Sequence, residues 1–296
     1  MKPAPFAYEA PESLPAALDL LARHGDEAKI LAGGQSLIPV LNFRLAQPAR
    51  LIDLNRIGGL SDIRRGADGG LSIGAMTRQR AVERSALVAE VAPLLAEAVP
   101  WIAHPQIRNR GTVGGSLAHA DPAAELPALA VALDARFRLA RSGSERWVAA
   151  RDFYTGLFST LMEPDELLAE IAIPPAAPRT GFAFLEIARR HGDYAQVGLA
   201  ASVTLEEDGR CRTARLVFLS VGDRPVDARA AASLLSGQAL TPDAIAACAA
   251  AVDAEIQPFS DVHATAEFKR HLAQVLARRA IAIAARRAGT APGSIL

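Results

Sequence analysis

Two short segments, each with paired glycines, constrain this chain more than any other feature. The first is Ala32 to Ser36 (AGGQS), and the second, 80 positions later, is Thr112 to Ser116 (TVGGS). Paired glycines let backbone N–H groups approach a phosphate without interference from Cβ atoms, and the serine adds a hydroxyl donor. Each segment alone is also compatible with a tight turn. Together they favour one shared ligand, such as a diphosphate.

Neither segment matches the common phosphate-binding motifs. No Lys-Ser or Lys-Thr pair follows the glycines, as a Walker loop requires, and no G-x-G-x-x-G opens a βαβ unit. A nucleotide bound here therefore needs a different fold.

Composition excludes several classes of function. The 296 residues include 32 basic and 32 acidic side chains, so the net charge is zero, and nothing favours nucleic acid or an anionic membrane as a partner. Cys211 and Cys248 stand apart without CxxC spacing, so the chain has no ligand set for an iron–sulfur cluster of its own. The N-terminus has no apolar leader, and we expect a cytoplasmic protein without membrane insertion.

The periodicity of apolar residues predicts a mixture of helices and short strands, typical of an α+β protein. The run Pro174 to Pro178 is the clearest linker, and we place a domain boundary there. Expected helices cover residues 13–24, 37–45, 77–85, 87–99, 228–236, 242–254 and 265–288. Expected strands cover 29–32, 51–54, 70–75, 170–173, a hairpin of 136–139 with 145–148, and then 181–189, 198–206 and 212–221.

The residues after the second glycine segment allow other chemistry. His119, Asp121 and Glu125 are potential metal ligands, but their spacing matches no standard zinc signature. Gly115 and Ser116 resemble part of a nucleophile elbow, although the final glycine of that motif is missing. Asp121 either accepts hydrogen bonds from loop amides or ribose hydroxyls, or caps a helix opened by Pro122.

Three ordered motifs together resemble one family: AGGQSLIPVLNFRLAQPARLIDL, IRNRGTVGGSLAHADPAAELPAL and RRHGDYAQVGLAASV. The chain resembles, over nearly its whole length, the FAD-binding medium subunit of the molybdenum hydroxylases, the group of carbon monoxide dehydrogenase and xanthine dehydrogenase. The resemblance implies an FAD-binding domain of the vanillyl-alcohol-oxidase (PCMH) type at 1–176, with subdomains of about 1–57 and 58–176. A smaller α+β domain at 177–288, with a three-stranded antiparallel sheet plus helices, and a flexible tail at 289–296 would follow.

The resemblance also implies a set of residues that bind FAD noncovalently, with no catalytic residue and no metal ligand in this chain. Backbone amides and hydroxyls of the two glycine segments would hold the diphosphate, and two acidic residues would contact the ribityl or adenosine part. Ile102 would contribute a backbone contact, two leucines would lie near the ring, and an aromatic residue would cover one ring face. The expected residues are Ala32, Gly33, Gly34, Gln35, Ser36, Leu37, Ile102, Thr112, Gly114, Gly115, Ser116, Asp121, Glu125, Leu167, Leu168 and Tyr194.

The resemblance implies an oxidoreductase subunit that transfers electrons. Electrons would pass from 2Fe-2S clusters of a small partner subunit through FAD to an external acceptor, while a large partner subunit with the molybdenum cofactor hydroxylates the substrate. The expected assembly is a dimer of heterotrimers. The alternatives are a self-sufficient FAD-dependent oxidase or dehydrogenase of the same fold, and a noncatalytic binding module in which both glycine segments are plain turns. The basic residues of the last helix alternate with apolar ones, which favours a scaffold or a subunit contact over nucleic acid.

Overall fold

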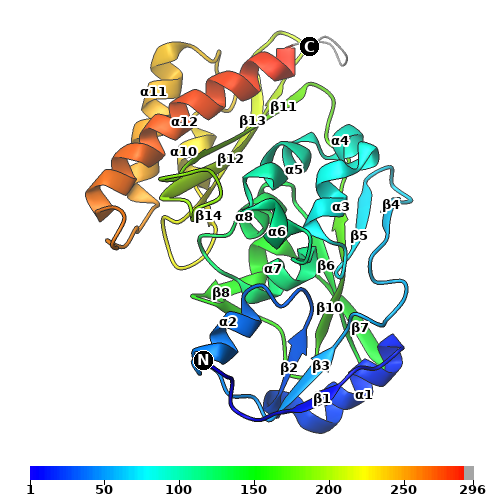
Figure 1. The fold of residues 1–296 in the computed structure, drawn as a ribbon. Helices are drawn as coiled ribbons and strands as arrows, with labels where there is room; N and C mark the ends of the chain where they lie inside the picture. Colours follow the sequence, from blue (N-terminus) through cyan, green and yellow to red (C-terminus); the bar gives the residue numbers. More distant parts are fainter. Residues whose placement is uncertain (290–296) are drawn as a thin grey trace.

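The computed structural model describes residues 1–289 and is built around three sheets that follow one another along the molecule (Figure 1). The first contains β1 (Ala7–Glu9), β3 (Arg50–Asp53) and β2 (Ala28–Leu31), all parallel, in that spatial order. Helix α1 (Leu14–His24) joins β1 to β2 and buries Leu18 and Leu21. Its N-cap is Ser13, whose hydroxyl accepts a hydrogen bond from the Ala16 N–H at 3.3 Å.

The second sheet is antiparallel and has the order β4-β5-β10-β6-β7. Its strands are β4 (Ile63–Arg65), β5 (Leu71–Gly74), β10 (Leu167–Ile173), β6 (Arg136–Arg141) and β7 (Ser144–Ala149). Helices lie against one face and enclose the largest hydrophobic core. They are α3 (Gln79–Arg84), α4 (Ala86–Val91), α5 (Pro93–Ala98), α6 (Pro105–Arg108), α7 (Val113–His119) and α8 (Glu125–Ala132).

The third sheet is antiparallel, with the order β11-β12-β13-β14. Its strands are β11 (Thr180–Ile187), β12 (Val197–Leu205), β13 (Cys211–Leu219) and β14 (Val226–Asp227). Helices α10 (Arg229–Ser233), α11 (Pro242–Ala251) and α12 (Ala266–Gly289) share a core with one face. The opposite face packs on α5 and α8, so this sheet closes against the helices of the preceding part.

Several sequence expectations need correction. The third sheet has a fourth strand, β14, whose two residues are too few to show a periodic pattern. The helix expected at 87–99 is divided into α4 and α5, because Pro93 has no N–H to continue the first helix. Pro122 opens no helix; the next one, α8, begins at Glu125. Gly289, expected in the tail, is the last residue of α12, and the rest of that tail, 290–296, lies outside the described residues.

Four shorter helices and strands are α2 (Leu37–Asn42), α9 (Ala150–Phe153), β8 (Tyr154–Gly156) and β9 (Ser159–Thr160). Three 3-10 helices complete the described fold: η1 (Gly25–Glu27), η2 (Val99–Trp101) and η3 (Val252–Ala254). None of the helices within residues 1–289 combines the length and apolar character needed to cross a membrane.

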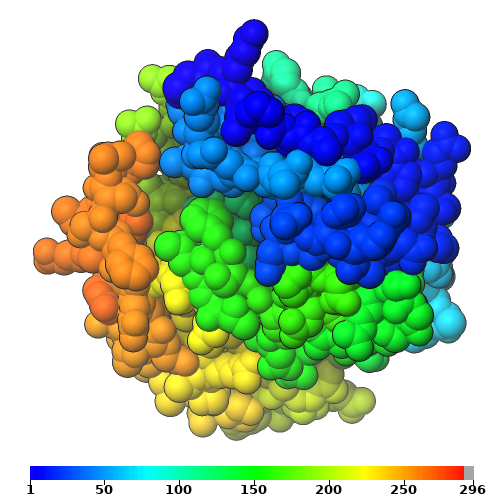
Figure 2. All heavy atoms as spheres, turned by 90° about the horizontal axis from the view of Figure 1, so that it is seen from below, coloured from blue at the N-terminus to red at the C-terminus, as the bar shows by residue number. Residues whose placement is uncertain are grey.

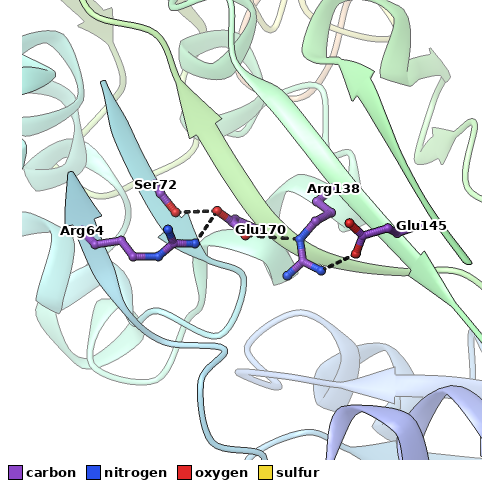
Figure 3. Close-up of polar contacts among 5 residues, drawn as sticks. All are labelled: Arg64, Ser72, Arg138, Glu145 and Glu170. Carbon is purple, nitrogen blue, oxygen red and sulfur yellow. Dashed lines mark hydrogen bonds and ion pairs between the residues drawn. The ribbon is translucent and has the colours of Figure 1, made fainter. Parts of the chain in front are cut away.

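A charged ladder crosses the second sheet on the face opposite its helices (Figure 3). Glu170 on β10 accepts hydrogen bonds from Ser72 on β5 at 2.6 Å, from Arg64 on β4 at 2.7 Å and from Arg138 on β6 at 3.2 Å. The register of β10 shifts at this point, between Leu168 and Glu170. Four of the five strands are thereby joined through one carboxylate, whose side chain is only 15% exposed.

We predict that Glu170→Ala lowers the stability of the protein by about 1–3 kcal/mol, because it removes the shared acceptor of a partly buried charged network. The matched control is Glu145→Ala, which removes an ion pair with Arg138 whose acid is 56% exposed and costs less than about 1 kcal/mol. Thermal unfolding monitored by circular dichroism compares the two. Equal midpoints for both variants would contradict the central role of Glu170.

Candidate cofactor site

The first glycine segment forms the loop between β2 and α2, and its backbone donors are unused. The N–H groups of five consecutive residues, Gly33 to Leu37, donate no hydrogen bond within residues 1–289. Gly34 has φ +72°, in the left-handed region that favours glycine, and Ser36 at the N-cap of α2 makes no capping hydrogen bond. Successive free N–H groups around a left-handed residue form a concave site for an anion. The segment therefore fits a phosphate group.

Gly33 is required for a different reason, because the backbone of Arg110 and Gly111 lies directly against it. A Cβ at this position would overlap the carbonyl oxygen of Arg110 and lie 2.8 Å from the Cα of Gly111. The two glycine segments are neighbours as well, since a Cβ on Gly115 would lie 3.5 Å from the Cβ of Ala32. The structure thus brings together the two motifs that are 80 positions apart in the sequence.

The second glycine segment is the N-cap and first turn of helix α7 and not a plain turn. Thr112 is its N-cap, and its hydroxyl accepts from the Gly115 N–H at 3.1 Å. The N–H groups of Val113 and Gly114 donate to Thr77 and Ala75, and that of Ser116 donates to Thr112. Four of the five N–H groups in this segment therefore have partners in the protein. Only the Thr112 N–H donates no hydrogen bond within residues 1–289, so it is the one backbone donor of this segment that fits the expected contact with the diphosphate. The hydroxyl of Ser116 has no partner within the described residues.

Gly114 is explained by packing rather than by a ligand. A Cβ at Gly114 would overlap the side chain of Ala75 and lie 2.8 Å from its Cα. The glycine lets α7 pack closely on the segment after β5, and this contact sets the position of the second glycine segment.

Arg78 joins the two glycine segments and was missed from the sequence. Its guanidinium donates to the Asn55 side chain at 2.6 Å and to the carbonyl oxygen of Arg110. Asn55 in turn donates to the carbonyl oxygen of Ala32 at 2.9 Å. Burial and the nearby positive charge of Arg110 lower the pKa of Arg78. No motif contains Arg78 or Asn55, so only the fold reveals their joint role.

Ile102 lies on a segment held by a buried arginine. The guanidinium of Arg108 donates to the carbonyl oxygens of Ile102 at 2.8 Å and Ala103 at 3.0 Å, and Ala103 has φ +43°. Arg108 also pairs with Glu83 at 2.9 Å, which lowers the pKa of that carboxyl. The Ile102 N–H donates to Val99. Both backbone polar groups of Ile102 thus have partners in the protein.

The three expected residues Asp121, Glu125 and Tyr194 share one electrostatic neighbourhood. Glu125 is buried at the start of α8, and burial raises its pKa to about 7, with the charge of Asp121 adding to the shift. Desolvation raises the pKa of Tyr194, and the charges of Asp121 and Glu125 add to that shift. Asp121 caps no helix; its carboxylate accepts from the Ala123 N–H at 2.9 Å.

Tyr194 belongs to the loop between β11 and β12, which rests on the segment that carries Ile102. The ring of His191 stacks on Trp101 with centroids 5.3 Å apart, and a Cβ on Gly192 would lie 2.5 Å from Nδ1 of His104. Tyr194 itself is 71% exposed. Figure 2 shows the face on which the blue N-terminal part, the green middle and the orange C-terminal region meet around a recess.

Leu167 and Leu168 lie in β10 and are buried in the hydrophobic cores on opposite faces of the second sheet. Leu168 shares its core with Val113 and Leu117 of α7. No group of three or more His, Cys, Asp or Glu side chains within residues 1–289 is arranged to hold a metal ion. Of this region's potential metal ligands, His119 instead packs on Phe158, with ring centroids 5.1 Å apart.

Comparison with known proteins decides the family. Residues 4–176 match the family model described as the FAD binding domain in molybdopterin dehydrogenase, and residues 182–284 match the CO dehydrogenase flavoprotein C-terminal domain.

The chain belongs to this family of FAD-binding oxidoreductase subunits.

Relatives cover almost the whole chain. The 6-hydroxypseudooxynicotine dehydrogenase complex subunit alpha of Paenarthrobacter nicotinovorans is 43% identical over 97% of each chain. The carbon monoxide dehydrogenase medium chain of Afipia carboxidovorans is 40% identical over 97% of this chain and 99% of its own. The solved carbon monoxide dehydrogenase from Hydrogenophaga pseudoflava superimposes with a TM-score of 0.94 at 40% identity, covering 97% of this chain and 99% of that one. The α+β fold and the FAD cofactor inferred from the sequence are confirmed.

We predict that Gly33→Ala weakens FAD binding by tenfold or more, because the added Cβ overlaps Arg110 and pushes the two glycine segments apart. Tenfold corresponds to about 1.4 kcal/mol. Gly58→Ala is the matched control, since a Cβ there meets nothing within 4 Å and Gly58 has no positive φ. FAD is titrated into the deflavinated complex and its fluorescence recorded. Unchanged affinity in the Gly33 variant would place the diphosphate elsewhere.

We predict that Arg78→Lys also weakens FAD binding, by about threefold to thirtyfold, because a lysine cannot bridge Asn55 and the Arg110 carbonyl as a planar guanidinium does. The control is Arg84→Lys at the exposed end of α3. The same FAD titration is combined with limited proteolysis, which reports loosening of the two segments. Wild-type values for both would show that Arg78 does not position the site.

Proposed function

We propose that this chain is the FAD-carrying electron-transfer subunit of a heteromeric molybdenum hydroxylase or dehydrogenase. Electrons pass from 2Fe-2S clusters of a small partner subunit through FAD to an external acceptor, and the large partner hydroxylates the substrate at its molybdenum cofactor. The observation that carries the proposal is the run of five unused N–H donors, Gly33 to Leu37, packed against Arg110 and Gly111 in a chain of this family.

The bound flavin supplies a redox centre that exchanges electrons singly or in pairs. The chain's own residues bind and orient it. The N–H groups of Gly33 to Leu37 donate to the diphosphate, and the hydroxyls of Ser36 and Ser116 are free to add further donors. The helix dipole of α7 adds a weak positive potential to the same place.

The remaining expected residues are assigned to the rest of the cofactor. Asp121 and Glu125 contact hydroxyls of the ribityl or adenosine part, and Tyr194 covers one face of the ring. Ile102, Leu167 and Leu168 form the packed support behind the ring. An aromatic side chain such as Tyr194, which is 71% exposed, suits a cover, because its face can lie over the ring and shield it from water.

This chain has only two cysteines, which supports placing the iron–sulfur clusters on a partner subunit. Cys211 and Cys248 are both fully buried in the core of the C-terminal part, and clusters need several thiolate ligands. Relatives carry names such as medium chain and complex subunit alpha. We propose a dimer of heterotrimers in the cytoplasm, with FAD bound noncovalently, the FAD-binding domain at 1–176 and the C-terminal domain at 177–288.

The test is purification of the chain together with whatever subunits assemble with it. We expect a flavin absorbance spectrum, a cysteine-rich small chain and a large chain containing molybdenum. Reduction with dithionite followed by an added acceptor should oxidise the complex rapidly, and removal of FAD should abolish this step while leaving the clusters reducible. Equal rates with and without FAD would overturn the proposed role. Turnover of a small substrate by this chain and FAD alone would identify a self-sufficient oxidase instead.

A further inference from the structure

Glu186 is a buried carboxyl group without any compensating contact. It lies on β11, on the same face as Phe184, and this face packs against the helices of the FAD-binding part. Only 7% of the residue is exposed, and both carboxyl oxygens are enclosed without a hydrogen-bond partner in the described part of the chain. On the next strand it is paired with Gly198, over which the side chain of Leu219 lies. Its surroundings are therefore apolar.

The charge that acts on Glu186 across the junction belongs to a second buried acid, Glu125, at the start of α8. Burial raises the pKa of Glu186 to about 8, and the charge of Glu125 adds to the shift. The Arg108 charge partly offsets the rise at Glu125, whereas Asp121 increases it. Both carboxyl groups therefore change protonation close to neutral pH, where a small change of local charge alters the number of protons that the pair holds.

One ion pair also lies against β11, and it does not include Glu186. From α5, Glu97 accepts from the Phe184 N–H at 3.3 Å and pairs with Arg287 of α12 at 2.6 Å. From β12 and β13 the facing residues, Gly198 and Leu219, are uncharged. In the adjacent loop, the charges of Asp121 and Glu125 help to raise the pKa of Tyr194, after the larger effect of desolvation. Within residues 1–289 Glu186 has no cationic partner, so an ion pair does not account for it.

The position of the pair points to the flavin, an argument that rests on the proposed function. Glu186 is at the base of the β11–β12 hairpin, which the Gln196 N–H closes onto the Ile187 carbonyl, and Tyr194 is in the loop of that hairpin. The charge of Glu125 acts on both Tyr194 and Glu186, so a ring covered by Tyr194 lies in the same electrostatic neighbourhood as the two acids. Reduction adds negative charge to that region, and a nearby negative charge increases the affinity of a carboxylate for protons.

We propose that Glu125 and Glu186, enclosed together at the junction of the two domains, take up a proton when the bound flavin is reduced and release it when the flavin is oxidised. Two electrons arrive from the partner's clusters and stay on the flavin. The flavin takes its own proton from solvent, and one further proton passes from solvent to a carboxylate of the pair, forming its O–H bond. Oxidation by the acceptor removes the two electrons and returns both protons to solvent.

The test is the pH dependence of the flavin midpoint potential in the purified complex, measured by dye-equilibrated redox titration. Above about pH 7 one extra proton per two electrons changes the equilibrium tenfold per pH unit, which steepens the slope by up to about 30 mV per unit. Glu186→Gln should lose most of this extra slope while retaining its FAD. Glu207→Gln, in the exposed turn after β12, is the control and should behave as the wild type.

A second measurement tests the proposal on the wild-type complex, in case the Glu186→Gln variant does not assemble with its partners. Infrared difference spectra of the wild-type complex, reduced minus oxidised, should contain a gained band of a protonated carboxyl group. The proton coupling would be overturned if the midpoint potentials of the wild type and of FAD-loaded Glu186→Gln had the same dependence on pH. It would also be overturned if the wild type showed no carboxyl band, and in either case the FAD role would stand. Equal reoxidation rates of the complex with and without FAD would instead overturn the proposed function.

Discussion

The contact between Gly33 and the Arg110–Gly111 backbone is the constraint on which the rest of the candidate site depends. Only a residue without a Cβ lets the β2–α2 loop lie this close to the start of α7. Arg78 secures the approach from both sides through Asn55 and the Arg110 carbonyl. The first sheet and the second sheet are thereby fixed to each other at the point where the unused N–H groups lie. A shift of either segment by the radius of one methyl group would separate the donors from their neighbours.

The two glycine segments have different physical tasks despite their similar sequences. In the first, five N–H groups remain free, and Gly34 takes a left-handed conformation that aligns them. In the second, the helix and the Ala75–Thr77 backbone use the donors of Val113 to Ser116, and Gly114 serves close packing. One segment therefore offers hydrogen bonds, and the other provides the rigid surface that holds it in place. Without this support the loop would be mobile and its five N–H donors solvated. Binding of a phosphate would then have to order the loop, and the lost conformational entropy would weaken the affinity.

Sequence reasoning identified the family, the FAD cofactor and most elements, because glycines, an N-cap such as Ser13 and apolar periodicity are local signals. It did not find Arg78, Asn55 or Glu186, since each acts through partners that are distant in the sequence. It also treated Thr112 to Ser116 as a loop, although Thr112 followed by an apolar run is a helix start. The fourth strand β14 was missed because its two residues are defined only by pairing with β13. Local patterns thus predicted the parts, and tertiary contacts determined which parts meet.

The C-terminal part carries no glycine motif, yet it completes the site through its junction with the first part. Its sheet turns one apolar face toward α5 and α8, and the β11–β12 loop places Tyr194 beside Asp121 and Glu125. An apolar junction alone would be more stable without Glu186, because an unpaired buried carboxyl costs free energy in either protonation state. Retention of two acids at this junction is therefore better explained by a change of charge nearby than by stability. The only group in the proposed assembly whose charge changes at this place during turnover is the flavin.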